Sequence, residues 1–221
     1  MREKTVDFDD ENSYEDFGIV FESLVIGRAE PQLVMIDVPF RNGSLDETDY
    51  FGDIRYKNRM ITMGFLIPWW SEDQYEIFGE VQNNLNGKRK RITFSADEDW
   101  YYEGRLTVGD FKIDNGFFKF DITATCDPYK YSDSSKTVYF ENDDPVSVIL
   151  ENDYMKTIPS FTCNVPIIVS FEENLYNFSE GTHSNPSIVF KKGKNYITVS
   201  IDGETEETEP YVTIAYRQGR L

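Results

Sequence analysis

Histidine, cysteine and long apolar runs are scarce in this sequence of 221 residues. Its two cysteines, Cys126 and Cys163, form neither a disulfide framework nor a metal-binding spacing, so we expect both to be reduced. No apolar run approaches the ~20 residues that cross a bilayer, and no basic segment leads into an apolar one. We therefore expect a soluble protein that is made without a signal-peptide route out of the cell.

Positive charge is also in short supply. The 22 lysines and arginines stand against 40 aspartates and glutamates, which gives a formal net charge of -18. This balance opposes non-specific attraction to nucleic acid and to anionic membrane surfaces. With 39% hydrophobic and 15% aromatic residues, the chain can still build a core for one large or two small domains.

Residues for catalysis and cofactor binding are poorly represented. The single histidine, His183, lies in a polar run that predicts an exposed loop, and no G-x-S-x-G motif or activated cysteine accompanies it. The acidic groups at 7–11, 97–99 and 141–144 lack the spacing of an EF-hand loop. We predict no catalytic, metal or cofactor site. A glycosidase pair of carboxylates stays open, because its members are distant in sequence.

One convincing helix follows Trp70 in a sequence that otherwise predicts strands. Ser71 is the expected N-cap, and Gln74 can complete a capping box. Asn86-Gly87 supplies a left-handed stop. Between them, apolar side chains recur at helical spacing, which predicts a short amphipathic helix packed on a sheet: Tyr75, Phe78, Val81 and Leu85.

Alternating patterns predict the strands of the first part at 19–26, 33–38, 60–67, 101–108 and 117–126. Asn115-Gly116 favours a type I′ hairpin turn. Cys126 continues the buried face of its strand, which indicates a core residue with a raised thiol pKa. The acidic segments 8–17 and 45–52 are expected to be an arm or loop and an exposed connection.

A boundary is predicted near Asp127-Pro128, with a Ser-rich connection at 132–135. Further strands are expected at 137–140, 146–150, 166–171, 187–190, 195–201 and 211–216, with an acidic loop at 204–209. Short strands separated by turns predict a β-sandwich.

Two features have alternative interpretations. The basic run Lys88 to Arg91 is typical of an exposed sheet edge, or of a patch for an acidic partner such as another copy of this chain. Three strand aromatics could stack on sugar rings, although packing within the sheet is the more usual role: Tyr101, Phe117 and Tyr139. Binding and assembly are therefore the favoured classes of function.

Five segments follow one another over most of the first 131 residues: FGIVFES (17–23), VPFRNGSLDET (38–48), NLNGKRKRI (84–92), DWYYEGRLTVGDF (99–111) and DPYKY (127–131). In this order they resemble the distal tail protein (Dit) family of phages with long non-contractile tails.

The resemblance implies a mainly β fold: a ring-forming N-terminal β-domain with one α-helix at 1–131, then a small galectin-like β-sandwich at 132–221. It implies that the last strand, 211–216, packs on either domain. The implied function is that of a virion structural protein rather than an enzyme: a baseplate hub at the tail tip, synthesised in the cytoplasm of the bacterial host.

The same resemblance implies a homohexameric ring that binds the tail-tube protein, a tail-associated lysin or tail fibre protein, and a receptor-binding protein. DNA would pass through the lumen without specific binding, and no membrane is involved. The alternative is a carbohydrate-binding module of a cell-surface or adhesion protein, and a glycosidase built on the sandwich is a weaker third candidate.

Overall fold

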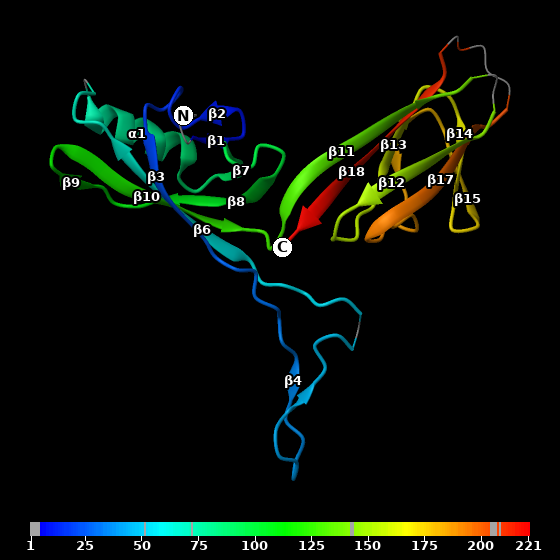
Figure 1. Ribbon diagram of the computed structural model, residues 1–221, viewed down its shortest axis with the longest axis horizontal. Helices are drawn as coiled ribbons and strands as arrows, with labels where there is room; N and C mark the ends of the chain where they lie inside the picture. Colours follow the sequence, from blue (N-terminus) through cyan, green and yellow to red (C-terminus); the bar gives the residue numbers. More distant parts are fainter. Residues whose placement is uncertain (1–4, 51, 72, 142–143, 204–206, 208) are drawn as a thin grey trace. The chain divides into compact units, whose positions relative to one another are not determined.

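The computed structural model describes residues 5–50, 52–71, 73–141, 144–203, 207 and 209–221 (Figure 1). The chain forms two compact units, Met1–Lys130 together with Leu221, and Tyr131–Arg220. The first therefore ends one residue before the sequence-based boundary at 131. The predicted fold class is confirmed, because both units are built from antiparallel strands and the described residues contain a single helix.

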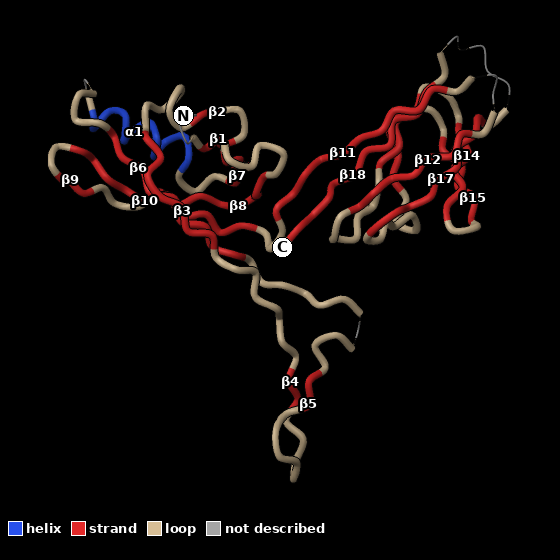
Figure 2. The backbone as a smooth tube through the Cα atoms, in the orientation of Figure 1, coloured by secondary structure: helices blue, strands red, loops and turns tan. Residues whose placement is uncertain are grey.

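Unit 1 is a β-sheet covered by the helix α1 (Figure 2). Its central strands follow the order β8-β10-β6-β3, β7 pairs with β8, and β1 pairs with β7. The elements are β1 (Val6–Phe8), β2 (Glu11–Asn12), β3 (Val20–Ile26), β4 (Met35–Ile36), β5 (Leu45–Asp46), β6 (Arg59–Ile67), α1 (Gln74–Leu85), β7 (Arg89–Phe94), β8 (Tyr101–Val108), β9 (Lys112–Asp114) and β10 (Phe117–Cys126).

The core of unit 1 lies between α1 and this sheet. Phe65 on β6 is fully buried, and its ring contacts Phe8, Phe21 and Phe120, with centroids 5.5 to 6.2 Å apart. The helix contributes the predicted buried face of Phe78, Val81 and Leu85. Such aromatic pairs add to the stabilisation that comes from burial alone.

The predicted helix is confirmed, but its first turn differs from the expectation. Asp73, not Ser71, is the N-cap, since its carboxylate accepts hydrogen bonds from the backbone N–H groups of Tyr75 and Glu76. The Gln74 amide does not complete a capping box. It donates hydrogen bonds to the carbonyls of Ile67, at the end of β6, and of Gly116, in the β9–β10 turn. The stop at Asn86-Gly87 is confirmed, with Gly87 at φ +75°.

For the first fifty residues, one prediction holds in part and one was wrong. The segment 8–17 was expected to be an arm or loop, and most of it is turn, but Phe8 and Glu11–Asn12 belong to strands and both Phe8 and Phe17 are buried. The strands there are too short to show periodicity. Conversely, the strand predicted at 33–38 is reduced to β4, which is exposed on both faces.

The hairpin prediction is confirmed by Asn115 at φ 51° and Gly116 at φ 83°, between β9 and β10. Cys126 lies at the end of β10 with no exposed surface, and burial raises the pKa of its thiol to about 12. Cys126 stands opposite Gly104 on β8. The close approach of these two strands leaves no room for a side chain at 104.

Unit 2 is a sandwich of two antiparallel sheets, in the orders β16-β13-β18-β11 and β12-β17-β14-β15. Its core is separate from that of unit 1 and includes Phe161, Phe190 and Val199. The elements are β11 (Lys130–Tyr139), β12 (Val146–Asn152), β13 (Ser160–Cys163), β14 (Ile167–Phe171), β15 (Asn174–Phe178), β16 (Gly181–Ser184), β17 (Gly193–Ile201) and β18 (Tyr211–Arg220).

Several local expectations in unit 2 were wrong. The Ser-rich segment 132–135 belongs to β11 rather than to a connection, and His183 lies on β16 rather than in a loop. The strand expected at 187–190 is reduced to an isolated bridge between Thr157 and Phe190. Most of the predicted acidic loop, 204–206 and 208, and residues 142–143 of one acidic group lie outside the described residues.

Candidate functional site

A two-stranded ribbon between β3 and β6, residues 28–58, is the most distinctive surface of unit 1; we call it the arm. Hydrogen bonds link its two halves, from Gln32 N–H to the Arg55 carbonyl and from Glu47 N–H to the Val34 carbonyl, each 2.8 Å long. Near its tip β4 pairs only with β5. The turn chemistry predicted at 41–44 is present, with Gly43 at φ +77°.

The arm exposes large apolar side chains along most of its length. Phe40 is fully exposed, and Tyr50 and Leu33 are 71% and 64% exposed. The apolar residues that predicted a strand at 33–38 are therefore exposed, and among the described residues of this chain nothing covers them. The exposed apolar set is Leu33, Val34, Met35, Ile36, Val38, Phe40, Tyr50 and Ile54. Contiguous exposed apolar surface of this kind marks interaction sites.

The tip of the arm presents one aromatic ring and one positive charge. Phe40 has φ +65°, a left-handed conformation that is uncommon for a bulky residue. Strained backbone of this kind concentrates at functional positions. Arg41, the next residue, is exposed and closes the turn through its N–H to the Val38 carbonyl at 3.2 Å.

A second exposed apolar surface lies where β6 leads into α1. Trp69 and Trp70 are 63% and 66% exposed, their rings meet edge to face at 5.7 Å, and Trp70 also meets Phe117 at 6.3 Å. We call these three residues the aromatic cluster. The Gln74 amide holds its two segments together by donating to the carbonyls of Pro68 and Gly116, at 3.1 and 2.9 Å.

The sheet face opposite α1 carries small polar side chains. Thr123 on β10 stands opposite Thr62 on β6 and Thr107 on β8, and all three are exposed or half-buried. Asp121 extends this face beside them. Arg105 on β8 and Lys119 on β10 share this face, so it combines a row of hydroxyl groups with charges of both signs.

The basic run is engaged within unit 1. Arg89 contacts Glu103 and Asp127 at 3.1 and 2.7 Å, and Lys90 lies 3.1 and 2.9 Å from Asp9 and Glu11. These pairs raise the pKa of Arg89, chiefly through Glu103, and the pKa of Lys90, chiefly through Glu11. Arg91 stacks over Tyr101 at 4.4 Å. Much of this charge is thus compensated before any partner binds.

The residues considered as catalytic or sugar-binding candidates do not lie together. Cys126 and Cys163 are buried in different cores, and burial raises the pKa of both thiols. The His183 ring stacks on Phe178 at 5.8 Å, and its Nε2 lies 3.2 Å from the Ser179 hydroxyl. The three aromatics considered for sugar stacking do not converge either: Tyr101 is buried, Phe117 joins the aromatic cluster, and Tyr139 belongs to unit 2.

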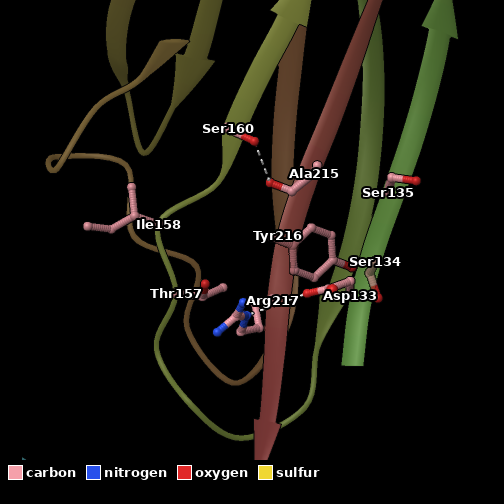
Figure 3. A pocket seen from close by; sticks show the side chains of 9 residues that line it. All are labelled: Asp133, Ser134, Ser135, Thr157, Ile158, Ser160, Ala215, Tyr216 and Arg217. Atoms are coloured by element: carbon pink, nitrogen blue, oxygen red, sulfur yellow. Dashed lines mark hydrogen bonds and ion pairs between the residues drawn. The ribbon is translucent and has the colours of Figure 1, made fainter. Parts of the chain in front are cut away.

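A hollow of about 330 Å³ opens on unit 2 beside β18 (Figure 3). Its polar groups satisfy one another: Arg217 lies 3.5 Å from Asp133, and the Ser160 hydroxyl donates to the Ala215 carbonyl at 3.3 Å. Tyr216 directs its hydroxyl to the Glu151 carbonyl at 2.7 Å, and burial raises its pKa. The lining offers hydrogen bonds but no nucleophile paired with a base.

The described residues contain no group of three or more histidine, cysteine, aspartate or glutamate side chains placed to hold a metal ion. Their one helix, α1, has 12 residues and is too short and too polar to cross a membrane.

Comparison with solved structures identifies the class of fold as that of a phage tail hub. The crystal structure of the SPP1 Dit (gp 19.1) protein, described as a paradigm of the hub adsorption apparatus in phages that infect Gram-positive bacteria, superposes with a TM-score of 0.65. The alignment covers 99% of each chain at 15% sequence identity. The resemblance read from the ordered sequence segments is thus confirmed at the level of the fold.

A conserved protein of unknown function from Pseudomonas aeruginosa PAO1 aligns over 90% of this chain and all of its own, with 7% identity and a TM-score of only 0.30. That likeness carries no argument. No protein-family model and no curated protein sequence matches the chain.

Proposed function

We propose that this chain is a structural protein of a phage tail tip. In this proposal six copies close into a ring that joins the tail tube to the baseplate, to a tail lysin or fibre protein, or to a receptor-binding protein. The fold shared with the SPP1 hub protein supports this class of function. The ring size and the partners follow from the family resemblance of the sequence.

The observation that carries the proposal is the arm. A ribbon that exposes eight large apolar side chains gains stability only when another surface covers it. If the arm of each copy binds a different surface of the next copy, the contact is heterologous, and such contacts form a ring when the rotation closes. Assembly therefore accounts for the exposed apolar side chains of the arm, which stabilise nothing in a monomer.

The sheet face opposite α1 is our candidate for the wall of the lumen. Thr62, Thr123 and Thr107 lie in one row there, beside the negative charge of Asp121. The basic residues of the same face are engaged within the unit: Lys119 pairs with Glu22 and Asp114 at 3.6 and 3.2 Å, and Arg105 donates to the Gly87 carbonyl. Binding to DNA phosphates needs basic groups that are free to pair with them, so such a wall should hold DNA only weakly.

A non-enzymatic role is supported by the placement of the candidate groups. The thiols are buried with raised pKa values, and the single histidine stacks on a phenylalanine at a sheet edge. The predicted result is no turnover of polysaccharide or peptidoglycan by the purified protein. Turnover that disappears on substitution of one carboxylate would overturn the non-enzyme assignment.

Mass measurement in solution, combined with negative-stain imaging, tests the ring. We expect a hexameric mass and closed rings. A chain that stays monomeric at high concentration, alone and when mixed with tail-tube or tail-lysin proteins, would refute the proposal.

Substitution of Met35 and Ile36 by serine tests the role of the arm. These side chains are 53% and 43% exposed, so folding should persist. Full burial of such a side chain contributes ~1.5–3 kcal/mol. Since each is already half covered, the pair should contribute about 1.5–3 kcal/mol per subunit contact, and the dissociation constant should rise roughly 10- to 150-fold. The matched control is Leu175→Ser, an exposed apolar residue of unit 2, which should leave assembly unchanged.

A further inference from the structure

The arm and the aromatic cluster are two exposed apolar surfaces on the same unit. We propose that the aromatic cluster is the seat into which Phe40 and Arg41 of a neighbouring copy insert. This inference rests on the proposed ring and goes beyond it, because it names the surface that receives the arm.

The placement of the two surfaces along β6 favours a contact between copies. The arm joins β6 at its first residue, Arg59, and the cluster begins two residues after its last, Ile67. Nine residues of strand separate them by roughly 30 Å. A head-to-tail contact joins two different surfaces of the subunit, and the arm and the aromatic cluster, at opposite ends of β6, are two such surfaces.

The chemistry of the two surfaces is complementary. An aromatic ring packs favourably against the edges and faces of other aromatic rings, and the cluster offers the exposed rings of Trp69 and Trp70. A guanidinium binds over the face of a tryptophan better than over other aromatic rings. Asp73 and Asp114 add negative charge to the segments that carry the cluster. Each already has a partner, because Asp73 caps α1 and Asp114 pairs with Lys119 at 3.2 Å.

The seat is held in shape before any partner arrives. The Gln74 amide bridges the loop after β6 and the β9–β10 turn. Gly116 packs so closely that a Cβ there would lie 3.2 Å from Cβ of Trp69. An exposed aromatic surface that receives an aromatic and an arginine anchor has the composition of an interface hot spot. At the other side of the contact, the left-handed backbone of Phe40 projects its ring away from the arm.

The arm of a second copy is one of several surfaces that would fit the aromatic cluster. A tail-tube or lysin partner could also cover exposed tryptophans. The arm of a second copy is favoured because it is itself apolar and uncovered, and because its tip carries a positive charge whereas the segments of the cluster carry Asp73 and Asp114. One contact then covers both exposed surfaces.

Cysteine cross-linking of the full chain tests this assignment. The native cysteines are 0% and 3% exposed, so they do not interfere. The double variant F40C/W70C, oxidised under assembly conditions, should give a ladder of disulfide-linked species up to the ring on non-reducing gels. Each single variant should give no species above a dimer. The control F40C/N83C places the second thiol at an exposed position of α1 away from the cluster and should give no ladder.

The outcomes separate this inference from the proposed function. Rings without a ladder in F40C/W70C, or with an equal ladder in the control, would overturn the inference and leave the ring proposal standing. Absence of rings in every variant and in the unmodified chain would overturn both.

A double-mutant cycle provides an independent readout. Phe40→Ala and Trp70→Ala should each weaken the subunit contact at least tenfold by mass measurement at increasing dilution. The double variant should be little weaker than the stronger single one, because both remove the same contact. Rings of unchanged stability in Trp70→Ala would assign the cluster to a different partner and refute the inference.

Discussion

Substitution of Gly104 by alanine should destabilise unit 1 through a clash between two backbones. A Cβ at 104 would lie 2.5 Å from Cys126 Sγ, 2.7 Å from the Thr125 carbonyl oxygen and 2.8 Å from Cys126 Cα. Two of these three atoms are backbone, so β8 and β10 themselves must separate. The perturbation therefore acts on the centre of the sheet rather than on a flexible side chain.

The expected magnitude follows from two opposing effects. Overpacking a well-packed core costs ~1–3 kcal/mol. Replacing a glycine inside a strand returns ~0.5–1 kcal/mol, because alanine loses less backbone entropy on folding. Because two of the three close contacts are with backbone atoms, the cost belongs in the upper part of its range, and the net loss should be about 1–2 kcal/mol. With a urea dependence of ~1–3 kcal/mol per molar, the unfolding midpoint should fall by roughly 0.3–2 M.

Tryptophan fluorescence during urea unfolding provides the assay. All three tryptophans, Trp69, Trp70 and Trp100, belong to unit 1, so the signal follows this unit although the chain has two separate cores. The matched control is Gly79→Ala on α1, where a Cβ would meet nothing within 4 Å. That variant should be stabilised by ~0.5–1 kcal/mol.

The opposite signs of the two alanine variants form the test. If Gly104→Ala is neutral or more stable than the parent chain, the strands do not approach as closely as described and the reasoning fails. Adding Cys126→Ala should restore only part of the loss, because the contacts with the Thr125 oxygen and the backbone of residue 126 persist.

Three further predictions concern each unit separately. Because burial raises the pKa of the Cys126 thiol from 9.0 to about 12, its contribution to stability is complete below pH 9 and is lost towards pH 12, by up to ~1.4 kcal/mol per pH unit. Urea titrations across that range should show a steeper decline in the parent chain than in Cys126→Ala, and equal slopes would contradict the buried thiol. A chain ending at Tyr131 keeps the first core and the arm and should still form rings in negative stain, whereas rings lost on truncation would move closure to unit 2. Unit 2 should bind glycans no tighter than ~10 μM, about −7 kcal/mol, and tighter calorimetric binding would favour the carbohydrate-binding alternative.

Local signals in the sequence predicted the elements whose causes are local. The stop at Asn86-Gly87, the Asn115-Gly116 turn and the buried face that ends at Cys126 each depend on residues within a few positions. Asp73 is the helix cap instead of Ser71 because polar residues two positions apart can both serve, and the choice depends on where the loop after β6 is anchored. That anchor, the Gln74 amide, includes a contact 42 positions away in the sequence.

Contacts between distant segments could not be read from spacing. Lys90 pairs with Glu11, 79 positions earlier, so a run of basic residues gave no indication that its charges are compensated inside the unit. The apolar alternation at 33–38 predicted a strand, but only Met35–Ile36 form one and its side chains are exposed. Periodicity shows that one face seeks cover, but it does not show whether the same chain supplies that cover.

The exposed arm also bears on how the free subunit behaves. β4 and β5 pair only with each other, so each leaves an unpaired edge flanked by apolar side chains, and such edges promote aggregation. If the arm binds the seat of the next copy as proposed, an open head-to-tail chain of any length would leave one arm and one seat exposed, and only a closed ring would cover them all. Intermediates between monomer and ring should therefore be sparsely populated, and closure of the ring would keep the protein soluble by covering its apolar surfaces.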